Sequence, residues 1–117
     1  MTDAFEEREH AAEAVFAREQ ELRFLALARR DKLFARWVAE QMNLHGAAGR
    51  ALSDRLLRVE GFPNHDQMLL ALAVAEFQSV EGAPDAAAAA NALRRHGETA
   101  LAELRRGDAA PIDPDAP

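Results

Sequence analysis

The ionisable side chains of this 117-residue chain form no recognisable catalytic or metal-binding arrangement. Adjacent carboxylates such as Glu6 and Glu7 stand in a strongly charged stretch, where we expect solvent rather than an environment suited to acid–base catalysis. His65 and Asp66 could together hold a cation, but helix capping or solvation is the favoured interpretation. None of the four histidines has a second ligand in a recognisable metal-binding spacing: His10, His45, His65 and His96. The sequence therefore predicts neither an enzyme nor a metal site.

One basic cluster is suited to contact an anion. Arg29, Arg30 and Lys32 could hold the phosphate of a nucleotide such as ADP or ATP. The favoured alternative is a solvated helix face, because the chain has no glycine-rich phosphate loop. The run from Gly46 to Gly49 lacks both the spacing and the Lys-Ser/Thr ending of that motif.

Length, composition and charge further limit the classes of protein to which this chain can belong. The length fits one domain with a modest core. The absence of cysteine excludes disulfides and fits a reducing, cytoplasmic compartment. The longest run without a charged or helix-breaking residue, 67–75, is too short to cross a membrane, and the acidic first residues do not resemble a targeting peptide. A net charge of −6 argues against a nucleic-acid partner.

Hydrophobic periodicity and breakers predict an all-α four-helix bundle with helices over residues 5–43, 47–60, 65–81 and 84–106. Gly46 and Gly49 are expected to cap and turn the first helix, Asn64 and Gln67 to form a capping box, and Pro84 to occupy the first turn of the fourth helix. The third helix, apolar almost all round, is expected to be the most buried. The fourth is expected to be marginal, with a stripe of small and apolar residues: Ala86, Ala90, Leu93, Gly97, Leu101 and Leu104.

The first helix is too long for the bundle. At 1.5 Å per residue it would span about 58 Å, whereas the later helices span about 20 to 35 Å. Residues 1–21 carry a net charge of −5 and only a thin apolar stripe built on Phe5 and Phe16. We predict that residues 1–21 are mobile until a partner covers this stripe, that residues 22–107 form the bundle, and that residues 108–117 are disordered. The bundle half of the helix has a broad apolar face, with Trp37 expected to be its largest burial: Leu22, Phe24, Leu27, Leu33, Phe34, Trp37, Val38 and Met42.

Residues 5–44 resemble the zeta subunit of alphaproteobacterial F-type ATP synthase. The resemblance rests on FEERE at 5–9, FA at 16–17, ELRF at 21–24, ARRDKL at 28–33 and Trp37, which occur in order without gaps. Beyond residue 45 only the helical layout is similar. Ala12 stands where the family usually has a bulky aromatic residue and Val15 where it has lysine, so this chain could be a diverged paralogue.

The resemblance implies a regulatory subunit whose N-terminal helix enters a catalytic interface between the α and β subunits, near γ, and blocks ATP hydrolysis while synthesis proceeds. It also implies weak binding of adenine nucleotide, and a monomer that is cytoplasmic and becomes peripheral to the inner membrane when bound to ATP synthase. The inhibitory segment would comprise the residues of the family motif together with the neighbouring valine: Phe5, Glu6, Glu7, Arg8, Glu9, Glu13, Val15 and Phe16.

Two alternatives from other classes stay open. One is a small helical nucleotide-binding protein that uses Arg29, Arg30 and Lys32 and has no inhibitory activity. The other is a helical adaptor or homo-oligomer, in which the first helix pairs with its own copy.

Overall fold

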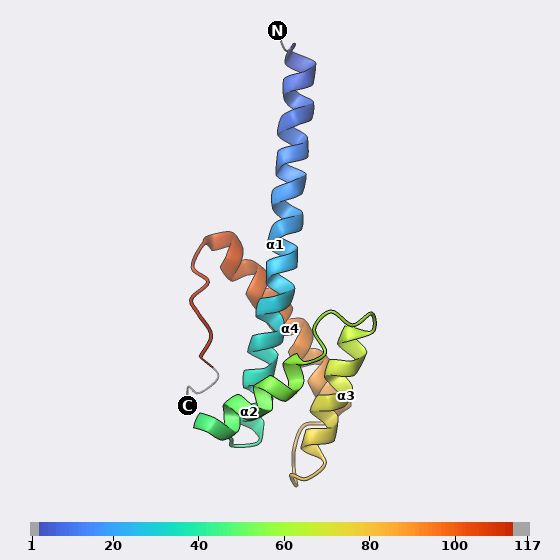
Figure 1. The fold of residues 1–117 in the computed structure, drawn as a ribbon, viewed down its shortest axis with the longest axis vertical. Helices are drawn as coiled ribbons and strands as arrows, with labels where there is room; N and C mark the ends of the chain where they lie inside the picture. The colour runs from blue at the N-terminus through green and yellow to red at the C-terminus, as the bar shows by residue number, and fades with distance from the viewer. Residues whose placement is uncertain (1–2, 114–117) are drawn as a thin grey trace.

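The computed structural model describes residues 3–113, and over this range the chain forms four α-helices and no strand. They are α1 (Ala4–Gln41), α2 (Gly46–Leu57), α3 (His65–Phe77) and α4 (Ala86–Arg106). The molecule measures 67 × 27 × 21 Å, because the first half of α1 projects well beyond the other helices (Figure 1). The prediction of an all-α bundle with an overhanging first helix is confirmed.

Several helix ends differ from those predicted. Asn43, with a φ of 55°, takes the left-handed position after α1, so Gly46 instead opens α2 and Gly49 is buried within it. The Asn64 capping box does not form, since the Asn64 side chain makes no capping hydrogen bond. Pro84 lies before α4 rather than in its first turn. The cap there is Asp85, whose Oδ1 accepts a hydrogen bond from the amide of Ala88 at 2.9 Å.

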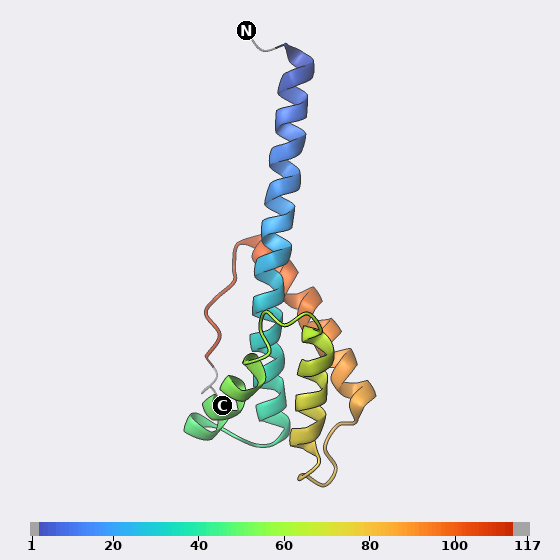
Figure 2. The same ribbon diagram turned by 45° about the vertical axis from the view of Figure 1, so that its right-hand side comes forward.

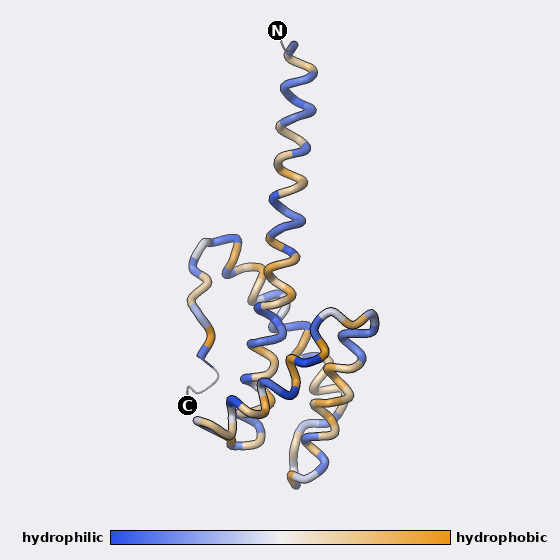
Figure 3. The backbone as a smooth tube through the Cα atoms, viewed as in Figure 1, coloured by the Kyte–Doolittle hydropathy of each residue, from blue (hydrophilic) through white to orange (hydrophobic). Residues whose placement is uncertain are grey.

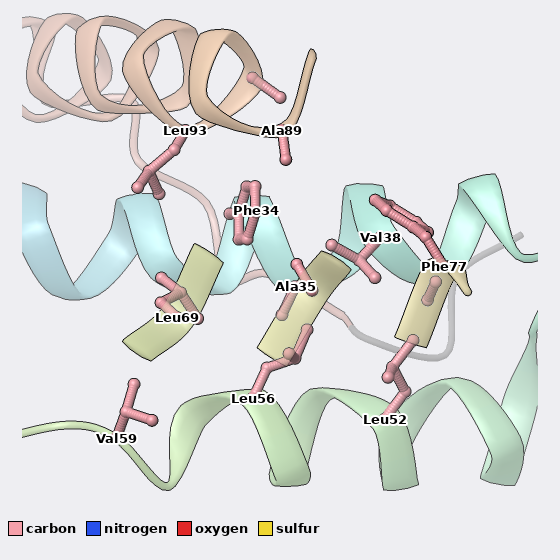
Figure 4. Packing of buried hydrophobic residues seen from close by; sticks show 13 residues of the cluster. Phe34, Ala35, Val38, Leu52, Leu56, Val59, Leu69, Phe77, Ala89 and Leu93 are labelled. Atoms are coloured by element: carbon pink, nitrogen blue, oxygen red, sulfur yellow. The ribbon is translucent and has the colours of Figure 1, made fainter. Parts of the chain in front are cut away.

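The core lies at the end of the molecule away from the N-terminus, where all four helices meet (Figures 1 and 2). Phe34, and not Trp37, is the largest fully buried side chain. Trp37 is half-buried at the edge of this core, with its ring 5.7 Å from that of Phe34 and 5.8 Å from that of Phe77. Figure 4 shows Ala35 of α1 directed toward Leu56 of α2, and Phe34 on the other side of α1, toward Ala89 and Leu93 of α4.

The expectations about α3 and α4 were wrong in detail. Only Leu69, Ala73 and Phe77 among the 13 residues of α3 are buried, whereas four of the 12 residues of α2 are, so α3 is not the most buried helix. In α4, Ala86 and Ala90 are exposed, whereas Leu93 of the predicted stripe is buried and its other members, Gly97, Leu101 and Leu104, are half-buried. The remaining buried residues of α4 are three alanines outside that stripe: Ala89, Ala92 and Ala100. These small side chains allow α4 to lie close against α1, and this interface is the most extensive in the bundle.

Two members of the predicted apolar face of α1 are also exposed. Phe24 is 73% exposed and Leu27 is 52% exposed, because they lie where α1 leaves the bundle. Figures 1 and 2 show α2 and α3 beside the later turns of α1 only.

The segment after α4 has no helix but contacts the bundle. Ala110 accepts a hydrogen bond from Arg29, and Ile112 is half-buried beside Lys32 and Leu57. Residues 114–117 of the tail that we predicted to be disordered lie outside the described residues. Among residues 3–113, no helix is long and apolar enough to cross a membrane.

Candidate functional site

The part of α1 that projects from the bundle, residues 4–21, is here called the arm. Its helix begins at Asp3, whose Oδ1 accepts a hydrogen bond from the amide of Glu6 at 2.8 Å. Glu6 and Glu7 in the first turn interact favourably with the positive end of the helix dipole. The arm contains no glycine or proline, so nothing in its sequence interrupts the helix. Its intrinsic helix propensity is enough to explain why α1 continues straight beyond the bundle.

The arm is exposed on every side. All residues from 3 to 18 are solvent-exposed, and the first ion pair to another helix joins Glu19 to Arg105 of α4. Figure 3 shows a mostly hydrophilic rod with short hydrophobic patches. A helix without tertiary packing has only its intrinsic propensity and local charge pairs to stabilise it.

Three large apolar side chains stand out on this rod. Phe5 is 68% exposed, Val15 70% and Phe16 66%. Phe5 and Phe16 are eleven residues apart, so at 100° per residue they point in directions only about 20° apart. Such aromatic side chains, exposed in line on a projecting helix, are suited to fill pockets on another protein.

The structure places all predicted residues of the inhibitory segment on the arm. The charged members are exposed and distributed around the helix, beside the line formed by Phe5 and Phe16: Glu6, Glu7, Arg8, Glu9 and Glu13. The arm thus carries aromatic groups on one line and mainly negative groups around it.

The basic cluster does not converge on one place. Arg29 points toward α4 and the following segment, where it donates to Glu103 and to the carbonyl of Ala110, each at 2.5 Å. Arg30 lies on another side of α1 and is buried. Lys32 is exposed beside α2. Contact between this cluster and a nucleotide stays a prediction, and two of the three bases already have carboxylate partners.

Arg30 belongs to a polar network that sequence reasoning missed, here called the Arg30 network and formed by Arg30, Asp31, His65 and Asp66. The guanidinium of Arg30 donates to Asp31 at 3.0 Å and to both oxygens of Asp66, at 2.6 and 3.2 Å. His65 Nε2 lies 2.5 Å from Asp31, and His65 Nδ1 lies 3.1 Å from the carbonyl of Val59. Both ring nitrogens of His65 therefore lie within hydrogen-bond distance of an oxygen atom.

The network balances the cost of burying charge. Burial disfavours the charged form of Arg30, but the hydrogen bond that Arg30 donates to Asp66 and the negative charge of Asp31 outweigh this cost and raise the pKa of Arg30. The hydrogen bond from Arg30 in turn lowers the pKa of Asp66. Gly97 of α4 leaves room for this arrangement, since a Cβ there would lie 3.3 Å from Cδ of Arg30. The network thus joins α1 to the start of α3, in the part of α1 that follows the arm.

One signal in the sequence could have indicated this network. Asp31 is three and four residues before Phe34 and Ala35, so it lies on the helix face that is buried. An acid on such a face needs a partner, and a histidine and a second acid follow at the start of the third helix. Among the described residues, no group of His, Asp and Glu has a geometry that could hold a metal ion.

Comparison with known proteins assigns a family to this architecture. A family model described as ATPase inhibitor subunit zeta matches residues 1–103, which include the whole arm and most of the bundle. No curated protein and no solved structure gives a significant match. Because the family match extends over far more than half of the chain, the protein belongs to the ATPase inhibitor subunit zeta family and is a regulatory subunit, not itself an enzyme.

Proposed function

We propose that this protein inhibits ATP hydrolysis by inserting the arm into the catalytic head of an F-type ATP synthase, at an interface between the α and β subunits and near γ. It would act in the cytoplasm, peripheral to the inner membrane. The observation that carries the proposal is the arm itself, a helix that is exposed up to residue 18 and bears Phe5 and Phe16 on one line in a chain of the ATPase inhibitor family. An exposed pair of aromatic side chains contributes little to the stability of an isolated small protein but is typical of a binding surface.

The proposed contact combines apolar anchors with charge pairs. Phe5 and Phe16 would enter apolar pockets, as helix-in-groove ligands do with anchors on one face. The acidic side chains beside them would pair with bases at the rim of the groove, and these pairs would favour one orientation of the helix. The bundle, which is wider than the arm, would remain outside and limit how far the arm enters.

Inhibition can be measured directly. The purified full-length protein, added to the catalytic head from its own organism, is expected to suppress ATP hydrolysis in a saturable manner. Serum albumin at the same concentration controls for nonspecific effects. Unchanged hydrolysis at saturating protein would contradict the proposal.

We also propose that the arm becomes fully ordered only in the complex. Between residues 3 and 18 no side chain is even half-buried, and helices of this length without packing are marginal in water. Hydrogen exchange of the free protein is expected to be fast at amides of residues 5–18 and slow at residues 33–41, the turns of α1 that pack against the core. Addition of the catalytic head is expected to slow exchange in the arm.

The late turns of α1 provide the internal control for that experiment, since their exchange should be equally slow with and without the head. Arm amides that exchange as slowly as residues 33–41 in the free protein would show a preformed rigid helix. That outcome would exclude folding on binding without affecting the proposed inhibition.

A further inference from the structure

The exposed apolar line of α1 continues past the arm. Leu27 follows Phe16 by eleven residues, as Phe16 follows Phe5, so all three side chains point within about 40° of one another. Leu27 is 52% exposed and Phe24, one turn before it, is 73% exposed. Successive members of this line are about 16 Å apart along the helix.

At Leu27 the line reaches a hollow in the bundle surface. A cavity of about 280 Å³ lies beside Phe24 and Leu27 and extends to the start of α3. A second hollow, of about 340 Å³, lies on the other side of Leu27 and reaches Gly97 and Leu101 of α4. Leu27 therefore stands between two concave surfaces, neither of which its own chain fills.

The first of these hollows is acidic at its rim. Asp31, Glu60 and Asp66 line it, together with Arg30 and His65. Even with His65 protonated, the acids exceed the bases by one charge. Glu60 is exposed, and its carboxylate makes no ion pair or hydrogen bond with the other residues that the structure describes. An occupant with an apolar group and a neighbouring positive charge would match this surface.

We propose that this hollow, here called the root notch and lined by Phe24, Leu27, Arg30, Glu60, His65 and Asp66, is a second docking site for the inhibited enzyme. Its occupant would be an enzyme segment that carries an apolar side chain next to a lysine or arginine. The inference rests on the proposed function, because a partner that covers Phe5 and Phe16 lies along the line that ends at Leu27. On this inference the bundle also contacts the enzyme, so that the affinity does not depend on the arm alone.

Charge argues against a second copy of this chain as the occupant. Residues 1–21 carry a net charge of −5, and the rim of the root notch is acidic as well. Two copies that paired arm to notch would bring like charges together, which is unfavourable.

The test compares variants of the full-length protein for binding to the catalytic head. The Phe24→Ala, Leu27→Ala double variant is expected to raise the Kd at least about tenfold, since it removes two apolar anchors. Glu60→Lys is expected to raise the Kd more at low than at high salt, because the interaction is electrostatic. Leu25→Ala is the matched control: Leu25 is 41% exposed on the same helix, about 160° away from Leu27, and its loss should leave the Kd unchanged.

The outcomes separate this inference from the proposed function. If the wild-type protein neither binds nor inhibits the head, both are wrong. If loss of Phe5 and Phe16 abolishes binding while the Phe24, Leu27 and Glu60 variants bind like wild type, only the root notch is excluded. A dimer detected by sedimentation and lost in the Phe24→Ala, Leu27→Ala variant would identify a second copy as the occupant and overturn the inference.

Discussion

The Phe5→Ala, Phe16→Ala double variant is expected to bind the catalytic head about a thousandfold more weakly than the wild type and to lose inhibition at concentrations where the wild type saturates. Each aromatic anchor of an interface contributes about 2 kcal/mol or more, so the loss of both corresponds to about three orders of magnitude in Kd. Titration of ATP hydrolysis against added protein, together with a direct measurement of Kd, checks both parts.

This loss should arise at the interface and not from unfolding. Phe5 and Phe16 are 68% and 66% exposed and pack against no other helix, so thermal unfolding of the bundle should be unchanged. Phe62→Ala is the matched control, since Phe62 is 52% exposed in the loop before α3 and belongs to neither proposed contact. A double variant that inhibits as well as wild type would exclude these residues as anchors.

The second large effect concerns folding. Asp31→Ala is expected to lower the free energy of unfolding by about 3 to 5 kcal/mol, the usual result of removing one member of a buried ion pair. Asp31 is 4% exposed, and its loss would leave Arg30 with Asp66 as its only acid and His65 without an acceptor at Nε2. Small domains have only about 5 to 15 kcal/mol of stability, so this change removes a large share.

Urea unfolding followed by circular dichroism measures this change. Asp54→Ala is the matched control, because the same substitution at an exposed position of α2 should alter stability by no more than about 0.5 kcal/mol. If Asp31→Ala does not fold, Asp31→Asn retains a hydrogen-bond acceptor and should give a smaller, measurable loss. An Asp31→Ala variant as stable as the Asp54→Ala control would show that the Arg30 network contributes little to folding.

Both effects bear on how the protein works. The Arg30 network lies directly below the arm and joins α1 to the start of α3. On the proposal that the arm becomes ordered on binding, the network would give the arm a fixed base, and the bundle would keep its structure in the complex. Destabilising the network should therefore weaken inhibition even in a variant whose arm is intact.

Comparison of the predicted and observed helices shows which features are local. The four helices and the overhang followed from periodicity, breakers and length, which depend on neighbouring residues. The ends were less accurate, because several residues could supply each cap. Asn43 takes the cap position that we assigned to Gly46, and Asp85 caps α4, so that Pro84 lies before the helix and not in its first turn.

Burial was harder to predict, because it depends on where other helices end. Phe24 and Leu27 have the same periodicity as Phe34 and Val38, but α2 and α3 do not extend to them, and they remain exposed. The alanine-rich fourth helix appeared weak by composition. Its small side chains instead give it the most extensive contact with α1.

The candidate site divides in the same way. The arm, its aromatic line at Phe5 and Phe16 and its resemblance to an inhibitor family could be inferred from the amino-acid order, because one continuous helix carries all of them. The Arg30 network and the root notch unite residues of α1 with residues more than thirty positions later. No local pattern encodes such proximity, since burial and charge pairing are settled only when the helices pack together.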